Sequence, residues 1–397
     1  MLNKNINKLL FYSLLAGITG SMYSVIFNLY LRDIGIENRF ISNMTSLELF
    51  GSAVLGLLLG IAGDKFGKSF FLKFLTISAG FFLIIRAVFP HPYVLFIISF
   101  LNGGFMAGRA IIINTLMVEN TDTSSRGKAF GYLIAINMGT GLFGNSFGGF
   151  LGDHIGLQNT LIISGLLFLC SSLPIITLHD RNKNNESIKQ IFDFSSLNIS
   201  ERKIMSGYLI STFTVGFGAG LFIHFGNLIF KDLFSMNPTM IGIALSIAQA
   251  GTAVGAALSP LLSKKFGALN YTGILQFFVV PLIIGLAYVR DPYMFTVLYA
   301  LRFSFMNMTS PVMSNIVLSN LPKNKITAIN SLNNLLNNLT RTVATALFGI
   351  IVGSTVSGYK ILFLISGLFY FINFIVFMFI FMPLKNDEKT MNLYKKE

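Results

Sequence analysis

Two long apolar runs joined by a short charged stretch constrain the fold more than any other feature of this sequence. The runs cover residues 44–62 and 70–89, and each is long enough to cross about 30 Å of hydrocarbon as a helix. The stretch that joins them contains Gly60, Asp64, Lys65, Gly67 and Lys68. Charged residues and glycines between two apolar runs predict a tight turn at a membrane surface.

The composition indicates that the whole chain follows this plan. Charged residues make up 11% of the 397 residues, hydrophobic residues 53%, and the mean hydropathy is +0.69. A soluble chain has about a quarter charged residues, so a soluble fold is excluded. The apolar runs are continuous rather than alternating, which argues against a β-barrel. We therefore expect an all-α membrane protein that crosses the bilayer many times.

The basic residues are distributed unevenly between the two sides of the predicted spans. Of the 29 lysines and arginines, twenty fall between spans on one side and five on the other. The positive-inside rule then predicts a multi-pass protein of the cytoplasmic membrane with both termini in the cytoplasm. The net charge of +13 is explained by topology, so we expect no binding to nucleic acid. The single cysteine, Cys170, excludes an intramolecular disulfide.

Twelve apolar segments are long enough to be membrane spans. A polar stretch after the sixth predicts a division into residues 1–180, a cytoplasmic linker 181–203, residues 204–383 and a cytoplasmic tail 384–397. The predicted spans are 9–31, 41–62, 70–89, 93–118, 129–151, 160–178, 204–230, 238–262, 269–289, 293–318, 326–353 and 358–382.

The second set of six spans repeats the first. The Lys-Phe-Gly sequence that begins at Lys65 recurs at Lys265, and His91-Pro92-Tyr93 resembles Asp291-Pro292-Tyr293. Both pairs are separated by 200 positions, which predicts two pseudo-symmetric six-helix bundles. In proteins built from such repeats, the binding site lies near the bilayer midplane, between the repeats.

This arrangement resembles the major facilitator superfamily of secondary transporters over essentially the whole chain. That family carries Gly-x-Leu-Ala-Asp-Arg-x-Gly-Arg after span 2; here Gly60, Asp64 and Gly67 match, and Lys65 and Lys68 replace the arginines. The resemblance implies alternating access, with these residues latching the cytoplasmic face. Glu119 and Arg126, beside the next cytoplasmic loop, are expected partners, and solvated loop charges are the alternative.

Span 5 resembles a glycine-rich pattern of antiporters in the same family. Four glycines match, but Thr140 and Asn145 stand in place of a further glycine and of the proline. The matching residues are Gly131, Gly144, Gly148 and Gly149. An arginine that many drug exporters carry in span 4 is absent from the equivalent position.

Arginines inside spans are costly in hydrocarbon and therefore point to a binding pathway or an ion pair. In span 4, Asn102, Met106 and Arg109 share a helical face, and their repeat equivalents in span 10 are Arg302, Met306 and Thr309. The resemblance places spans 1, 4, 7 and 10 around the cavity. We expect at least one of these two arginines to contact substrate, with Asn102, Met106, Met306 and Thr309 as further substrate-binding residues. A structural salt bridge or a capped carbonyl is the alternative for the arginines.

Span 11 carries a polar stripe. Asn330, Asn334, Asn337 and Arg341 share one face, and Asn333 and Asn338 flank it. Such a face cannot lie against lipid, so we expect it to contact water or protein. Asn334, Asn337 and Arg341 are therefore candidate substrate-binding residues.

Glu48 is the carboxylate that the prediction places within a span, in the outer part of span 2. An apolar environment favours the neutral form of a carboxyl group, so Glu48 is the candidate for proton coupling. An outer-gate salt bridge, with Arg341 as a possible partner, and a headgroup-level acid are the alternatives. Arg86 is expected to reach outward to the surface, and His224 to be a hydrogen-bonded packing residue.

These features predict a transporter and not an enzyme. The chain lacks a phosphate-binding Gly-x4-Gly-Lys-Ser/Thr sequence, and its four histidines and one cysteine have no metal-ligand spacing, so we expect no cofactor and no metal. Four span arginines against one acid favour proton-coupled efflux of an anionic or amphipathic small molecule. A multidrug exporter of lipophilic cations, a lipid or lysolipid flippase and a non-transporting sensor remain alternatives. We expect a monomer.

Overall fold

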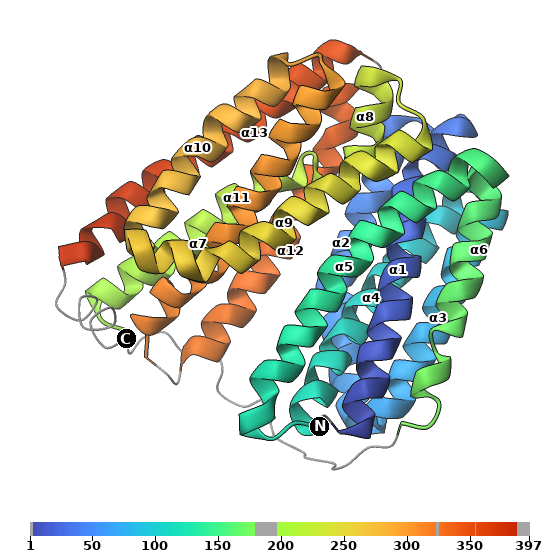
Figure 1. The fold of residues 1–397 in the computed structure, drawn as a ribbon, viewed down its shortest axis with the longest axis horizontal. Helices are drawn as coiled ribbons and strands as arrows, with labels where there is room; N and C mark the ends of the chain where they lie inside the picture. Colours follow the sequence, from blue (N-terminus) through green and yellow to red (C-terminus); the bar gives the residue numbers. More distant parts are fainter. Residues whose placement is uncertain (1–2, 179–196, 323–324, 354, 387–397) are drawn as a thin grey trace. The chain divides into compact units, whose positions relative to one another are not determined.

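The computed structural model describes residues 3–178, 197–322, 325–353 and 355–386, and these ranges contain helices and no β-strand (Figure 1). Ten helical segments are long and apolar enough to cross a membrane. α5 and α11 complete the twelve predicted spans. The helices are α1 Lys4–Asp33, α2 Asn38–Phe66, α3 Lys68–Val88, α4 Pro92–Glu119, α5 Thr123–Ile155, α6 Leu157–Cys170, α7 Ile199–Gly220, α8 Gly226–Phe234, α9 Pro238–Phe266, α10 Ala268–Tyr288, α11 Pro292–Ser319, α12 Ile326–Val352 and α13 Val356–Val376.

The turn between spans 2 and 3 is shorter than the sequence suggests. Residues 60–66 are the last turns of α2, and Gly67 alone joins α2 to α3 with a φ of 103°. Gly267 makes the same connection between α9 and α10 with a φ of 78°. Because L side chains rarely adopt such φ values, both junctions require glycine. The predicted repeat is thus present in the backbone conformation of the two turns.

The ends of α4 and α11 repeat each other as well. Both helices have proline at the first position, preceded by His91 in one and by Asp291 in the other. Both end at an asparagine, Asn120 or Asn320, with nearly identical backbone angles. Proline suits this position because the first helical N–H has no intrahelical acceptor.

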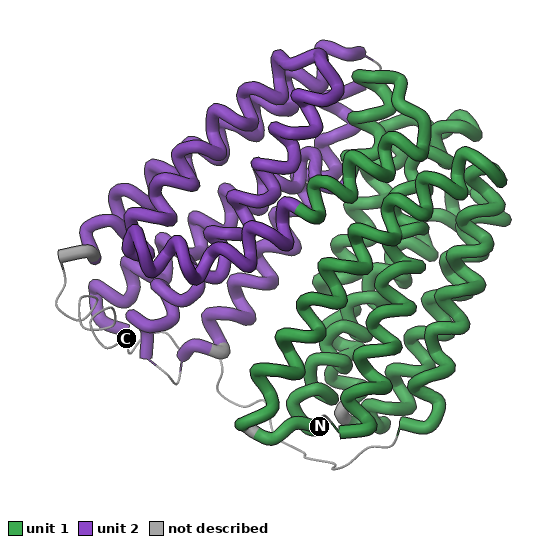
Figure 2. The backbone as a smooth tube through the Cα atoms, in the orientation of Figure 1, with its two compact units in different colours: residues 1–186, 225–250 green, residues 187–224, 251–397 purple. Residues whose placement is uncertain are grey.

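The chain divides into two compact units (Figure 2). Unit 1 comprises residues 1–186 and 225–250, and unit 2 comprises residues 187–224 and 251–397. α8 and the first part of α9 therefore belong to unit 1. Most of the predicted linker and tail lie outside the described residues. The last residues of the predicted linker are helical, since α7 begins at Ile199. Asn198 and Glu201 form a capping box that stabilises this helix start.

In unit 1, a row of tyrosines joins α1 to α3. The hydroxyl of Tyr12 bonds to Thr76 at 2.7 Å, and the hydroxyls of Tyr23 and Tyr30 donate to the carbonyls of Leu83 and Ala87 at 3.1 and 2.9 Å. The tyrosines are separated by eleven and seven residues, so they lie on one helical face. Each of these buried hydroxyls thus has a hydrogen-bond partner. Without one, its burial in an apolar environment would cost free energy.

The glycines of α5 differ in what surrounds them. A Cβ at Gly144 would lie 2.5 Å from the carbonyl oxygen of Ile18, and one at Gly148 would lie 2.7 Å from Met22 Cα, so both allow α5 to approach α1. A Cβ at Gly149 would overlap the carbonyl of Pro238 at the start of α9, whereas one at Gly131 would meet no atom within 4 Å. Three of the four predicted glycines thus serve close helix packing.

Span 7 is interrupted, contrary to the continuous span that the sequence predicts. α7 ends at Gly220, a 3-10 turn follows at Ile223–Phe225, and α8 begins at Gly226. Two side chains bond to carbonyls near the break: Ser366 donates to Gly218 at 2.7 Å and Thr345 to Gly220 at 3.0 Å. Backbone groups released from a helix within a membrane require such partners.

Candidate functional site

Unit 2 contains a polar cavity of about 210 Å³ surrounded by α7, α10, α11, α12 and α13. This volume is below the roughly 300–1,000 Å³ of typical ligand pockets, so the cavity suits a small molecule or the polar end of a larger one. None of its lining residues is acidic. The lining residues are Tyr208, Ser211, Thr212, Val215, Gly216, Ala219, Ile223, Gln276, Arg302, Met306, Asn307, Thr309, Ser310, Met313, Ser314, Asn333, Asn337, Arg341, Tyr370 and Asn373.

Arg302 is the most deeply buried charge of this cavity, with 2% of its surface exposed. Its guanidinium carbon lies 4.8 Å from the ring centroids of Phe222 and Phe303 and 5.2 Å from that of Tyr370. It also donates a hydrogen bond to the Tyr370 hydroxyl. Aromatic faces stabilise a cation without neutralising it. The positive charge of Arg302 is therefore retained inside the cavity.

Arg341 adds a second positive charge to the same cavity. It is half-buried, its Nε has no hydrogen-bond partner, and it interacts repulsively with Arg302. Within the described part of unit 2, the acidic residues are Glu201 and Asp291, and both cap helix N-termini. Two arginines without a neighbouring carboxylate favour a bound anion.

The cavity also contains buried polar atoms that lack a partner in the protein. These are Gln276 Oε1, Asn337 Oδ1 and the Nε atoms of Arg302 and Arg341. An unpaired buried polar group costs about 1–3 kcal/mol, so such a group usually meets water or a ligand. The cavity thus offers a ligand two amide oxygens as hydrogen-bond acceptors and two positively charged guanidinium groups as donors.

The wall opposite these groups is a hydrogen-bonded network. Asn333 donates to the Tyr208 hydroxyl at 3.2 Å and accepts a bond from Thr212, and Tyr208 lies 3.4 Å from Ser314. Asn334, which the sequence indicated as a binding residue, is exposed and does not line the cavity. Asn337 and Arg341 of the predicted stripe line the cavity, and Asn333 lies beside them in place of Asn334.

Unit 1 contains a repeat-related cavity of about 180 Å³. Each of its lining residues corresponds to a lining residue of the cavity in unit 2 at an offset of 199 or 200. Asn137 corresponds to Asn337, for example, and Arg109 to Thr309. The two bundles therefore carry equivalent cavities. The residues that line the cavity of unit 1 are Tyr12, Ser13, Ala16, Gly17, Arg109, Ala110, Ile113, Asn114, Leu133 and Asn137.

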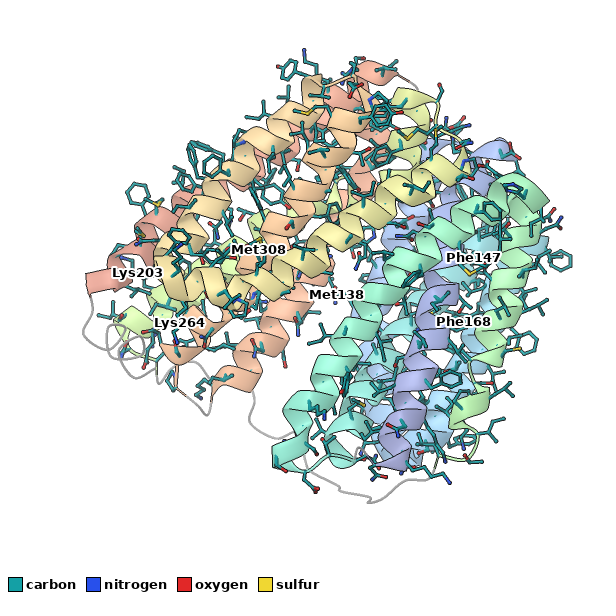
Figure 3. The ribbon with its side chains drawn as sticks, in the orientation of Figure 1. Met138, Phe147, Phe168, Lys203, Lys264 and Met308 are labelled. Atoms are coloured by element: carbon teal, nitrogen blue, oxygen red, sulfur yellow. The ribbon has the colours of Figure 1, made fainter. Side chains whose placement is uncertain are left out.

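Arg109 is held by aromatic groups in this second cavity. It donates to the Tyr12 hydroxyl at 3.1 Å, and its guanidinium carbon lies 4.7 Å from the ring centroid of Phe168, which Figure 3 labels on α6. Its Nε has no hydrogen-bond partner. Arg109 thus has the same environment as Arg302, an arginine against aromatic rings at the wall of a cavity. Met106, on the same helix, lines neither cavity.

Glu48 is the centre of a separate polar cluster in unit 1. Its carboxylate accepts hydrogen bonds from Arg86 at 3.0 Å and from Asn102 at 2.8 Å. Arg86 is 2% exposed and lies over the Phe27 ring, so the prediction that it reaches outward to the surface is wrong. The partner that the structure gives Glu48 is Arg86, which the sequence analysis did not propose.

At the predicted cytoplasmic end of unit 1, Lys68 and Glu119 form an ion pair with a distance of 2.6 Å. This joins the start of α3 to the end of α4. Lys65 is exposed and lies over the Phe66 ring. The side chain of Asp64 lies outside what the structure describes. Arg126 is in the first turn of α5, and Glu119 pairs with Lys68 rather than with it.

The structure thus brings together five of the predicted substrate-binding residues. They share the cavity of unit 2 and are Arg302, Met306, Thr309, Asn337 and Arg341. Sequence reasoning missed Gln276 and Tyr370, which are single polar residues in otherwise apolar runs. Within the described ranges, no three histidine, cysteine or acidic side chains lie close enough to hold a metal ion.

Comparisons with known proteins place the chain among membrane transporters. The sequence profile of the Major Facilitator Superfamily matches residues 9–345. The quinolone resistance protein NorA of Staphylococcus aureus (strain COL) is 22% identical over 324 residues, which are 79% of this chain and 81% of that protein. The multi-drug resistance efflux pump PmrA homolog of Lactococcus lactis is 22% identical over 356 residues, 86% of this chain and 85% of that protein.

Solved structures share the fold at low sequence identity. The nucleoside transporter NupG has a TM-score of 0.78 at 16% identity and covers 95% of this chain and 99% of its own. A bacterial homologue of the human lysosomal transporter Spinster, in an inward-facing and occupied conformation, has a TM-score of 0.75 at 13% identity. The match covers 94% of this chain and 96% of that one. These likenesses confirm the predicted fold class.

Proposed function

Because the chain belongs to the major facilitator superfamily, we propose that it is a secondary transporter that exports an anionic or amphipathic small molecule across the cytoplasmic membrane. Members of this family work by alternating access, and the relatives with matching sequences are named as resistance or efflux proteins. The uneven distribution of basic residues supports an orientation with both termini in the cytoplasm.

The observation that carries the substrate class is the cavity of unit 2. Arg302 and Arg341 line it, and no lining residue is acidic. An anion would relieve the repulsion between the two guanidinium groups and satisfy their Nε donors. Met306 and Met313 line the same cavity and would contact an apolar part of an amphipathic molecule.

Proton coupling is assigned to Glu48. It pairs with Arg86 and accepts a hydrogen bond from Asn102, so a proton taken up by this carboxylate would break the ion pair and release Arg86. The coupling step is therefore a change in the packing of α2 against α3 and α4. Glu48→Gln is expected to abolish uphill transport driven by a pH gradient and to leave downhill exchange of substrate intact.

Export of lipophilic cations is the second candidate, and the names of the two relatives support it. A cavity that selects cations would need a carboxylate or an aromatic cage without a competing cation. Two aromatic residues line the cavity of unit 2: Tyr370 already contacts Arg302, and the Tyr208 hydroxyl is hydrogen-bonded to Asn333. This favours the anionic class.

A thermal-stability screen of the purified protein tests the substrate class. The panel holds organic anions, lipophilic cations, sugars and lysolipids. A ligand at a hundredfold excess over its dissociation constant stabilises the folded state by about 2.7 kcal/mol. Stabilisation by anions that is lost in Arg302→Gln supports the proposal. Stabilisation by cations that is retained in that variant contradicts it and favours multidrug export.

A further inference from the structure

A second kind of site lies on the outer surface of unit 1, along α1 and the end of α6. It is a groove of about 610 Å³, and it shares no lining residue with the cavity that contains Arg109. Lys4, Lys8, Phe11 and Leu15 form one wall and follow the helical spacing of a single face of α1. Cys170 and the 3-10 turn after α6 contribute to the other wall.

The apolar part of the groove is open to its surroundings. Phe11 is 53% exposed and Leu173 is 62% exposed, and Cys170 is exposed as well. In a chain that spans a membrane, such side chains lie against lipid. The groove is thus a concave surface that a hydrocarbon chain can occupy.

One end of the groove is positively charged. Lys4 and Lys8 are its charged lining residues. Lys8 donates one bond to the Thr177 carbonyl at 3.0 Å, which leaves two of its three ammonium protons for another acceptor. Within the part of the chain that the structure describes, Lys4 has neither a hydrogen bond nor an ion pair. Lys73 approaches the same end of span 6, where it donates to the Leu178 carbonyl at 3.3 Å.

The length of the groove matches one leaflet of a bilayer. Leu15 lies eleven residues after Lys4 on a continuous helix, which is a rise of about 16 Å. Half of a hydrocarbon core about 30 Å thick is about 15 Å. The lysines therefore lie at headgroup level when Phe11 and Leu15 lie beside acyl chains.

From this charge, exposure and length we infer that the groove is a binding site for an anionic phospholipid, with the phosphate on Lys4 and Lys8 and an acyl chain along Phe11 and Leu173. Each lysine near a membrane surface raises the affinity for anionic lipids by roughly fivefold. This site is independent of the proposed transport function, because it shares no residue with the cavity of unit 2.

The single cysteine of the chain makes the inference testable on the intact protein. The protein is reconstituted in nanodiscs of phosphatidylcholine alone or with a minor fraction of phosphatidylglycerol. The alkylation of Cys170 by N-ethylmaleimide is followed by intact mass spectrometry. A phosphatidylglycerol molecule that is held by Lys4 and Lys8 keeps its acyl chain over Cys170, whereas phosphatidylcholine exchanges freely, so the rate is expected to fall several-fold in the mixed discs.

Two double variants separate a specific site from general charge attraction. Lys4→Gln/Lys8→Gln removes the phosphate contacts, and Lys264→Gln/Lys265→Gln removes the same charge from exposed lysines at the end of α9, where Figure 3 labels Lys264. Protection should disappear in the first variant and persist in the second. Glycerol phosphate added to phosphatidylcholine discs should give no protection.

Native mass spectrometry gives a second measurement that does not depend on Cys170. The protein released from mixed discs should retain phosphatidylglycerol, and the Lys4→Gln/Lys8→Gln variant should not. Equal alkylation rates in both kinds of disc, or protection and lipid retention that persist in that variant, would overturn the assignment.

Discussion

The two arginines of the unit 2 cavity should have opposite effects on stability when each is replaced by glutamine. Arg302 contacts three aromatic rings and the Tyr370 hydroxyl, whereas the structure gives Arg341 no hydrogen bond within the described residues. A desolvated cation–π contact contributes about 0.5–2 kcal/mol and a hydrogen bond about 1 kcal/mol. Arg302→Gln is therefore expected to destabilise the ligand-free protein by about 2 kcal/mol.

Arg341→Gln is expected to stabilise the ligand-free protein. Arg302 and Arg341 line one cavity, and two unit charges about 8–10 Å apart repel by about 2 kcal/mol at an effective dielectric constant of 20. Arg341 is half-buried, so solvent screening reduces the relief to about 1 kcal/mol. For a unit of this size, that corresponds to a rise of roughly 2–4 °C in the unfolding midpoint.

Thermal unfolding in detergent at low ionic strength measures both effects. Arg290→Gln is the matched control, because Arg290 belongs to unit 2, is exposed and bonds only to the nearby carbonyls of Ala287 and Val289. Its change should stay within about 0.5 kcal/mol. If Arg341→Gln lowers the midpoint while Arg290→Gln does not, Arg341 has a stabilising partner and the reasoning from unpaired charge fails.

Two further predictions concern unit 1. Gly149→Ala should destabilise the protein, because the added Cβ would overlap the Pro238 carbonyl. Gly131→Ala on the same helix should be neutral or slightly stabilising, because the added Cβ meets no atom. Thermal unfolding of the two variants measures the difference. Glu48→Gln should cost about 3 kcal/mol because it leaves Arg86 buried without a counter-charge, and adding Arg86→Met should recover part of the loss. A double variant less stable than Glu48→Gln alone would contradict the second prediction.

The twelve spans and their repeat could be predicted because both depend on properties that are local in sequence. Span length follows from the thickness of the bilayer, and the repeat from matching turn residues such as Gly67 and Gly267. The break in span 7 could not be predicted in the same way. It depends on Ser366 and Thr345 of distant helices, which bond to carbonyls near the break.

The candidate site was predictable in kind but not in detail. Arg302 and Arg341 are identified by the cost of a charge within a span. Asn333 and Asn334 point about 100° apart on α12, and packing determines which of them lies beside Asn337 and Arg341 at the cavity. The ion pair of Glu48 with Arg86 likewise depends on how α2 packs against α3. The position of Arg86 in the sequence does not indicate this partner.

Transport by the protein in proteoliposomes distinguishes an exporter of anions from an exporter of lipophilic cations. An anion that stabilises the protein in the screen is loaded, a pH gradient is imposed, and flux is followed for the wild type, Arg302→Gln, Arg341→Gln and the Arg290→Gln control. We expect uphill movement of the anion that both cavity variants lose and the control retains. Uphill transport of lipophilic cations that persists in both cavity variants, with no anion transported, would contradict it.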